Sequence, residues 1–184
     1  MIDMLVSGEL RKKNIAEYLL YMWQVEDSIR AAGLDEERLY GAIISQSQCS
    51  DEVRQEWKQW YSDLIRMMIE EDKREKGHLQ INENVLILLD DLHGRLMESS
   101  KHAEYRDIYY KVLPLIVEFR QKNGDTGNNE IRDCFELMYG VWMLRLQKKE
   151  ISQATLKAVN AVSGFLGRLA AYYSEEKAGT LELD

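Results

Sequence analysis

Proline is nearly absent from this chain, which has one, Pro114, among 184 residues. A proline inside a helix removes a backbone donor and clashes with the preceding turn, so its rarity leaves long helices possible. Apolar residues recur at helical spacing in almost every window between Glu9 and Tyr173. The sequence therefore predicts an all-α fold, a bundle of six to seven mostly antiparallel helices.

Cysteine and histidine are also scarce. The two cysteines, Cys49 and Cys134, stand far apart, which favours reduced core thiols over a disulfide framework. The three histidines lie in different segments, and none completes a Glu-x-x-His pair of the di-iron type within a predicted helix. No nucleotide-binding loop or nucleophile elbow interrupts the helical pattern. We therefore expect no metal, no cofactor and no catalytic residue of a known type, and the chain leans away from being an enzyme.

Long apolar runs and a net basic charge are missing as well. The run from Val85 to Leu89 stops at Asp90, far short of the roughly 20 residues that a membrane span requires. The segment from Met1 to Val6 carries an acid where a signal peptide has basic residues. The net charge of -8 argues against nonspecific nucleic-acid binding. We expect a cytoplasmic protein with no membrane or nucleic-acid partner.

The helical pattern gives approximate boundaries. Pro114 falls inside one predicted helix and should kink it near Tyr110. Another, residues 130–149, is apolar on several faces, so it should be central. The interpretation is one helical-bundle domain over residues 1–173 and a polar, flexible tail over 174–184. The predicted helices cover about residues 9–32, 35–46, a segment from 50, a segment from a cap at Asn82, 103–122, 130–149 and 152–173.

Two charged residues interrupt apolar stripes. Glu26 lies on the stripe of the first helix, and Arg145 lies within the apolar run from Val141 to Leu146. A lone buried charge costs several kcal/mol, so either the two form an internal ion pair or one reaches water. The alternative is a ligand pocket, whose candidate residues are Trp23, Glu26, Tyr139, Trp142 and Arg145.

Polar and basic side chains gather at two predicted helix starts. The N–H groups at a helix start can bind an anion, although Asn82 could simply cap its own helix. The basic cluster near residue 11 lies early in its predicted helix, where the dipole disfavours cations. It is either a solvated helix end or a site for a bound phosphate or an acidic partner. The candidate anion site comprises Arg11, Lys12, Lys13, His78, Gln80 and Asn82.

Small residues recur every four positions in the last predicted helix, at Ser163, Gly167 and Ala171. Glycine costs about 1 kcal/mol against alanine inside a helix, so a close helix contact should compensate. That contact is either a tight crossing within the chain or the interface of a homodimer.

Three segments carry a family resemblance: Arg11–Trp23, Glu75–Asn82 and Arg145–Ser152. Through them nearly the whole chain resembles a family of uncharacterised helical proteins of Bacteroides-type bacteria. The resemblance implies a bacterial cytosolic source and transfers no site residue. Two functions stay open, a noncatalytic scaffold or protein-interaction module and a small-molecule or anion-binding bundle.

Overall fold

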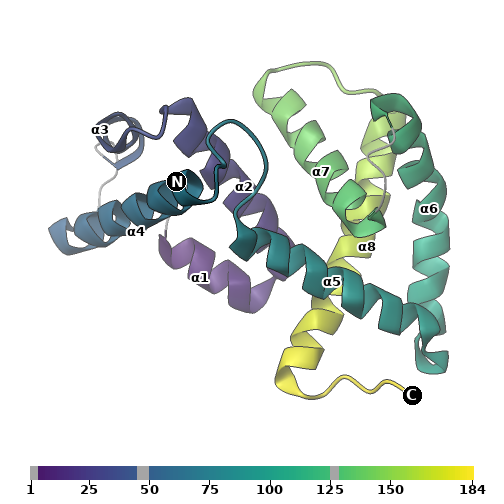
Figure 1. Ribbon diagram of the computed structural model, residues 1–184. Coiled ribbons are helices and arrows are strands. Elements are labelled where there is room, and N and C mark those ends of the chain that lie inside the picture. The colour runs from purple at the N-terminus through teal and green to yellow at the C-terminus, as the bar shows by residue number, and fades with distance from the viewer. Residues whose placement is uncertain (1–3, 45–49, 125–128) are drawn as a thin grey trace. The chain divides into compact units, whose positions relative to one another are not determined.

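The computed structural model describes residues 4–44, 50–124 and 129–184, and these ranges contain helices and turns but no strand (Figure 1). The all-α fold predicted from the sequence is confirmed. The chain divides into two compact units, Met1–Val85 and Leu86–Asp184, which are described separately below. Within the described ranges, no helix is both long and apolar enough to cross a bilayer.

The described residues of the first unit form five α-helical segments and one π-helical turn. Its order is α1 (Met4–Lys13), α2 (Ile15–Ala31), α3 (Glu36–Leu39), the π turn η1 (Tyr40–Ile44), α4 (Asp51–Glu70) and the start of α5 (Gln80–Glu98). Local caps explain several boundaries, because Asp35 accepts from Arg38 N and Ser50 from Val53 N. Both caps agree with the sequence pattern.

Asn14 explains why the described residues hold eight α-helices rather than six or seven. Its backbone is extended, with φ -154° and ψ 99°, and its side chain accepts hydrogen bonds from Ala16 N and Glu17 N. Its own N–H donates to Leu10 O and closes the preceding helix. The single helix predicted for residues 9–32 is therefore divided into α1 and α2.

The core of the first unit is rich in aromatic residues. Helix α2 buries Leu19, Val25 and Ile29 completely, and α4 contributes Trp57 and Tyr61 at 2% and 1% exposure. This burial accounts for the broad aromatic face of the α4 sequence, because large apolar side chains gain most from leaving water.

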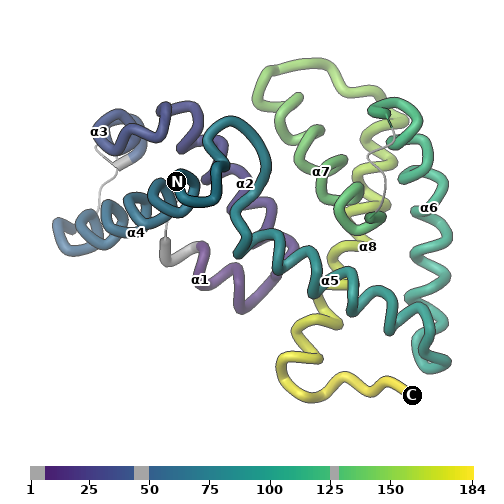
Figure 2. The backbone as a smooth tube through the Cα atoms, in the orientation of Figure 1, coloured from purple at the N-terminus to yellow at the C-terminus, as the bar shows by residue number. Residues whose placement is uncertain are grey.

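The second unit contains the rest of α5, the 3-10 turn η2 (Ser100–His102), α6 (Ala103–Asn123), α7 (Glu130–Leu146) and α8 (Gln153–Ala178). Helices α6, α7 and α8 pack against one another, as the tube in Figure 2 shows. Its core side chains include Leu92, Leu96, Tyr105, Val112, Ile131, Cys134, Phe135, Val162 and Phe165, each at most 1% exposed.

The predicted central helix is central in its first half. In α7, Ile131, Cys134 and Phe135 are fully buried, whereas Leu146 at its end is 58% exposed. Helix α6 continues through Pro114, which is exposed and cannot donate a hydrogen bond to the Tyr110 carbonyl. A kink at this position stays a prediction.

The segment expected as a tail, residues 174–184, begins inside α8. The helix continues to Ala178 and ends at Gly179, whose φ of +71° lies in the left-handed region that glycine adopts readily. Residues 182–184 then make polar contacts with Ser100, Lys101 and His102. The flexibility of the tail and the single domain over 1–173 both stay predictions.

Candidate functional site

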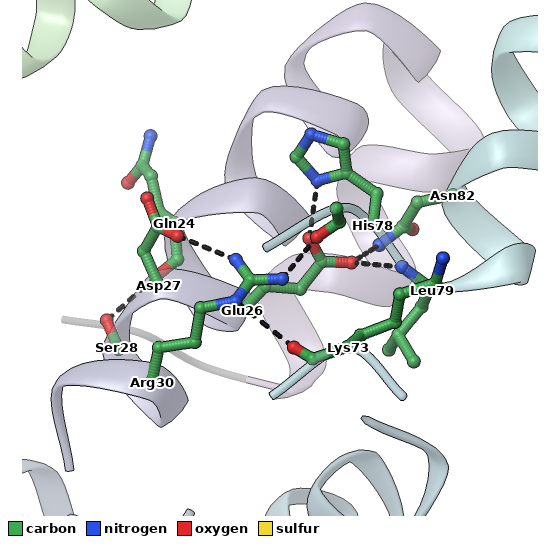
Figure 3. A network of polar contacts seen from close by, with 10 residues as sticks. Gln24, Glu26, Asp27, Ser28, Arg30, Lys73, His78, Leu79 and Asn82 are labelled. Carbon is green, nitrogen blue, oxygen red and sulfur yellow. Dashed lines mark hydrogen bonds and ion pairs between the residues drawn. The ribbon is translucent and has the colours of Figure 1, made fainter. Parts of the chain in front are cut away.

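Glu26 is the one acid among the predicted site residues, and it lies within α2 with 0% exposure. Its Oε1 accepts hydrogen bonds from Leu79 N at 2.9 Å and Asn82 Nδ2 at 2.7 Å (Figure 3). Its Oε2 lies 2.6 Å from Nδ1 of His78. These donors compensate for the loss of water around the carboxylate, which explains how an acid can occupy an apolar stripe.

The same contacts set the start of α5. The helix begins at Gln80 and not at the predicted cap Asn82. Leu79 N donates to Glu26, and Gln80 N donates to Glu71 Oε2 at 2.7 Å. Free N–H groups at a helix start need acceptors, and the positive end of the dipole favours carboxylates there. Two acids of the chain itself thus accept from the N–H groups at the helix start, where an external anion was one of the two alternatives. The assignment of Asn82 as the cap is corrected, because α5 begins at Gln80.

A loop closes over this carboxylate. The His78 ring stacks on Trp23 with centroids 4.1 Å apart and planes 10° apart, and its side chain is 21% exposed. Arg30, which is also on α2, donates to two carbonyl groups of the same loop, Lys73 O at 3.3 Å and Gly77 O. Its guanidinium also contacts Asp27 at 2.7 Å. Figure 3 shows these groups converging from α2 and the loop.

The contacts of this cluster join a loop to a helix. A carboxylate that orients an imidazole is one part of many general-base sites. Here the contacts of His78 are with Glu26 and Trp23. Asn82 Oδ1 is buried and has no hydrogen-bond partner among the described residues. The hydrogen bonds from His78 and Leu79 to Glu26 fasten the 71–79 loop to α2.

The basic cluster of the candidate anion site has a local explanation. Arg11, Lys12 and Lys13 form the last turn of α1, where the negative end of the helix dipole favours cations. Lys13 pairs with Glu9 at 3.0 Å, and the Arg11 guanidinium lies 5.5 Å from the Tyr18 ring centre. The expectation that this cluster lies early in a helix is wrong, because Asn14 ends α1 directly after it.

The candidate ligand pocket mixes residues of the two units. Trp23 and Glu26 belong to the first unit, whereas Tyr139, Trp142 and Arg145 belong to the second. Tyr139 and Trp142 stack with ring centres 5.5 Å apart. Arg145 is exposed, so the expectation that it is a core residue is wrong. Its apolar neighbours lie in the last turns of α7, where the helix emerges at the surface of its unit.

The small residues of α8 do not mark a tight crossing within the chain. Ser163, Gly167 and Ala171 are all exposed. A Cβ placed on Gly164 or Gly167 would meet no atom within 4 Å. The expected close contact is therefore absent at these glycines among the described residues of the second unit, and the homodimer alternative stays a prediction.

The second unit holds a buried polar cluster that sequence reasoning missed. His93 Nδ1 lies 2.7 Å from the Tyr105 hydroxyl, and Tyr109 donates to Glu130 at 2.6 Å. Burial lowers the pKa of His93, which keeps the imidazole neutral, and raises the pKa of both tyrosines. The separate helices involved carry no common spacing, so a pattern search could not find this cluster.

Cys134 lies within the same core at 0% exposure. Burial, followed by the charge of Asp133, raises the pKa of its thiol well above the usual range. The thiol is therefore an unreactive core group, in agreement with its predicted role. Cys49 lies outside the described residues.

The second unit also contains an apolar hollow, formed where α6, α7 and the start of α8 meet, with a volume of about 760 Å³. Four of the polar residues at its edge interact within the chain: Lys122 pairs with Glu118 at 2.6 Å, and Ser152 contacts Thr155 at 2.9 Å. Its apolar walls are formed by Leu115, Phe119, Leu137, Val141, Leu144, Ala154 and Ala158. Because three helices contribute these residues, a search for sequence motifs could not find the hollow.

Comparisons with known proteins give one match. The model of a family described as "Domain of unknown function (DUF4924)" matches residues 4–180. The match spans every α-helix described above. No curated protein and no solved structure matches the chain.

Proposed function

This chain belongs to the family described as a domain of unknown function (DUF4924), so membership transfers no activity, and we propose that it is a noncatalytic helical module that binds another protein. A cytoplasmic location and a Bacteroides-type source are part of the same proposal. The partner we propose is a protein that inserts the apolar face of a helix into the hollow between α6, α7 and α8.

The observation that supports this proposal is the composition of the hollow. Its walls are mainly aliphatic and aromatic, and Lys122 and Ser152 at its edge already interact within the chain. A site of this kind attracts a partner by burying apolar surface rather than by chemistry at a reactive group. An amphipathic helix in an apolar groove is a common form of such recognition.

A second candidate function is the binding of a small apolar molecule. The volume of about 760 Å³ lies within the range of roughly 300–1,000 Å³ that is typical of small-molecule pockets. Lys157 lies at the hollow and could attract an anionic head group. The two functions differ in what fills the hollow, so one set of variants can separate them.

The experiment tests whether a larger side chain in the hollow blocks binding of the partner. Ala158 lines it, whereas Ala161, on the same helix, is exposed and does not. A photoreactive phenylalanine analogue at Ala154 should form an adduct with one protein in the source cells. Ala158→Phe should abolish that adduct, whereas the control Ala161→Phe should preserve it.

The other outcomes are equally informative. Mapped adducts in which the contacting peptide lacks apolar residues at helical spacing would contradict the helix-in-groove proposal. A small molecule that copurifies with the parent chain and is lost from Ala158→Phe would favour the second candidate. An adduct from Ala154 that is equally strong in Ala158→Phe and Ala161→Phe, with no copurifying molecule, would refute both.

A further inference from the structure

Residues 181–184, Leu-Glu-Leu-Asp, lie as an extended segment along the turn between α5 and α6. Leu181 and Leu183 are half-buried, whereas Glu182 and Asp184 are exposed. This alternation is that of an extended chain with one face against a surface, because successive side chains point to opposite sides. The segment follows the C-cap at Gly179 and has no regular secondary structure.

The turn meets this segment with hydrogen-bond donors. The Ser100 N–H and hydroxyl both donate to the Asp184 carboxylate, the hydroxyl at 2.9 Å. Lys101 Nζ donates to Leu183 O at 3.2 Å and lies 3.6 Å from a Glu182 carboxylate oxygen. These donors keep the pKa of Asp184 below its usual value, chiefly through the Ser100 N–H, so the carboxylate is charged.

His102 completes the contact. Its Nε2 lies 2.9 Å from Glu182 O, and because a carbonyl oxygen can only accept, Nε2 carries the hydrogen. The ring packs edge-on against Tyr172, with centres 4.8 Å apart, which orients it. Two of the contacts thus recognise main-chain carbonyls and the others recognise carboxylates.

We propose that Ser100, Lys101 and His102 form a binding site for an extended peptide segment of the pattern Leu-Glu-Leu-Asp, which residues 181–184 occupy in cis and an equivalent segment of another chain can occupy instead. We call these three residues the cradle. The donors of the cradle suit an acidic segment, and the half-burial of Leu181 and Leu183 indicates that apolar residues fit at alternate positions of the segment.

The resident segment is held in a way that permits exchange. Lys101 and Glu182 retain 48% and 82% exposure of their side chains, so water and salt screen their attraction. Holding a segment without regular structure also costs conformational entropy. When the segment leaves, the donors of the cradle face solvent and can bind another acceptor.

The test uses the full chain with Leu181→Ser, Leu183→Ser and Asp184→Ser, which keeps its length and silences the resident segment. The probe is a fluorescent peptide, Gly-Thr-Leu-Glu-Leu-Asp with an amidated end, followed by anisotropy. It should bind the silenced chain at least about 10-fold more tightly than the parent, because a tethered competitor acts at high effective concentration.

Two controls test specificity. Adding Lys101→Ala to the silenced chain should reduce peptide affinity, whereas Lys111→Ala, which removes an exposed lysine of α6, should not. A peptide with asparagine in place of its aspartate should bind weakly. Hydrogen exchange gives an independent readout, since the Ser100 amide should exchange faster in the silenced chain than in the parent.

Three comparisons can each overturn the proposal. The outcomes that do so are equal peptide binding by the parent and silenced chains, equal binding of the aspartate and asparagine peptides, and equal exchange of the Ser100 amide in the two chains. No saturable binding to the silenced chain would also overturn it. The inference does not depend on the apolar hollow, so the two proposals can fail separately.

Discussion

Replacing Glu26 by leucine should destabilise the first unit by about 2–4 kcal/mol. Leucine is similar in volume, so the loss comes from the donors left behind. Leu79 N–H and the Asn82 amide would remain buried without their acceptor, and each such group costs about 1–3 kcal/mol. Removing a buried carboxylate also removes its desolvation penalty, which offsets part of that loss.

Glu26→Gln separates charge from hydrogen bonding. The amide oxygen can still accept from Leu79 N and Asn82 Nδ2, so this variant loses chiefly the charge-assisted contact with His78. The expected cost is about 1 kcal/mol, the difference between a charged and a neutral hydrogen bond. Glu56→Leu is the matched control, because Glu56 is exposed on α4 and surface changes stay within about 0.5 kcal/mol.

Urea unfolding followed by tryptophan fluorescence measures these differences. Hydrogen exchange of the Leu79 amide adds a local measurement, which distinguishes the first unit from the second if they unfold separately. The loss in free energy of unfolding should be largest for Glu26→Leu, smaller for Glu26→Gln and smallest for Glu56→Leu. A leucine variant as stable as the parent, or a glutamine variant as unstable as leucine, would refute the role assigned to the Glu26 hydrogen bonds.

Three further predictions concern the second unit. Because the pKa of His93 is lowered below 6.5 on folding, its contribution to stability should be complete above about pH 6.5 and decline as the pH falls further. The difference in melting temperature between pH 7.5 and pH 5.5 should therefore be smaller for His93→Phe than for the parent. Gly164→Ala and Gly167→Ala should each stabilise α8 by about 0.5–1 kcal/mol, and a fall in melting temperature would reveal a contact at that face. Arg145→Ala should change the free energy of unfolding by less than about 0.5 kcal/mol, whereas a larger loss in urea unfolding would mean that the exposed guanidinium has a structural partner.

Local patterns predicted the parts of the fold that local forces determine. Ser50 and Ser152 cap α4 and α8 where the sequence placed caps, since a cap acts on residues two or three positions away. Asn14 caps α2 in the same way. The sequence pattern did not indicate this cap, because the apolar periodicity continues across Asn14. One polar residue at the junction of two stripes divided a predicted helix.

The candidate site depended on contacts that are distant in the sequence. Glu26 was correctly singled out as an acid on an apolar face, and its partners His78 and Asn82 were singled out as well, but as members of a different site. Nothing in their spacing links residues more than fifty positions apart. The expectation for Arg145 was wrong for another reason. The apolar run begins buried at Val141, but α7 reaches the surface of its unit by Arg145.

The burial of Cys134 provides a way to time the opening of the second unit. A protonated thiol inside a closed core cannot react with an alkylating reagent, so labelling must wait for the helices around it to separate. The sequence contains one other cysteine, Cys49, and Cys49→Ser would leave Cys134 as the sole thiol. The labelling rate of that variant would then report how often the core of α6, α7 and α8 admits solvent, without any added probe.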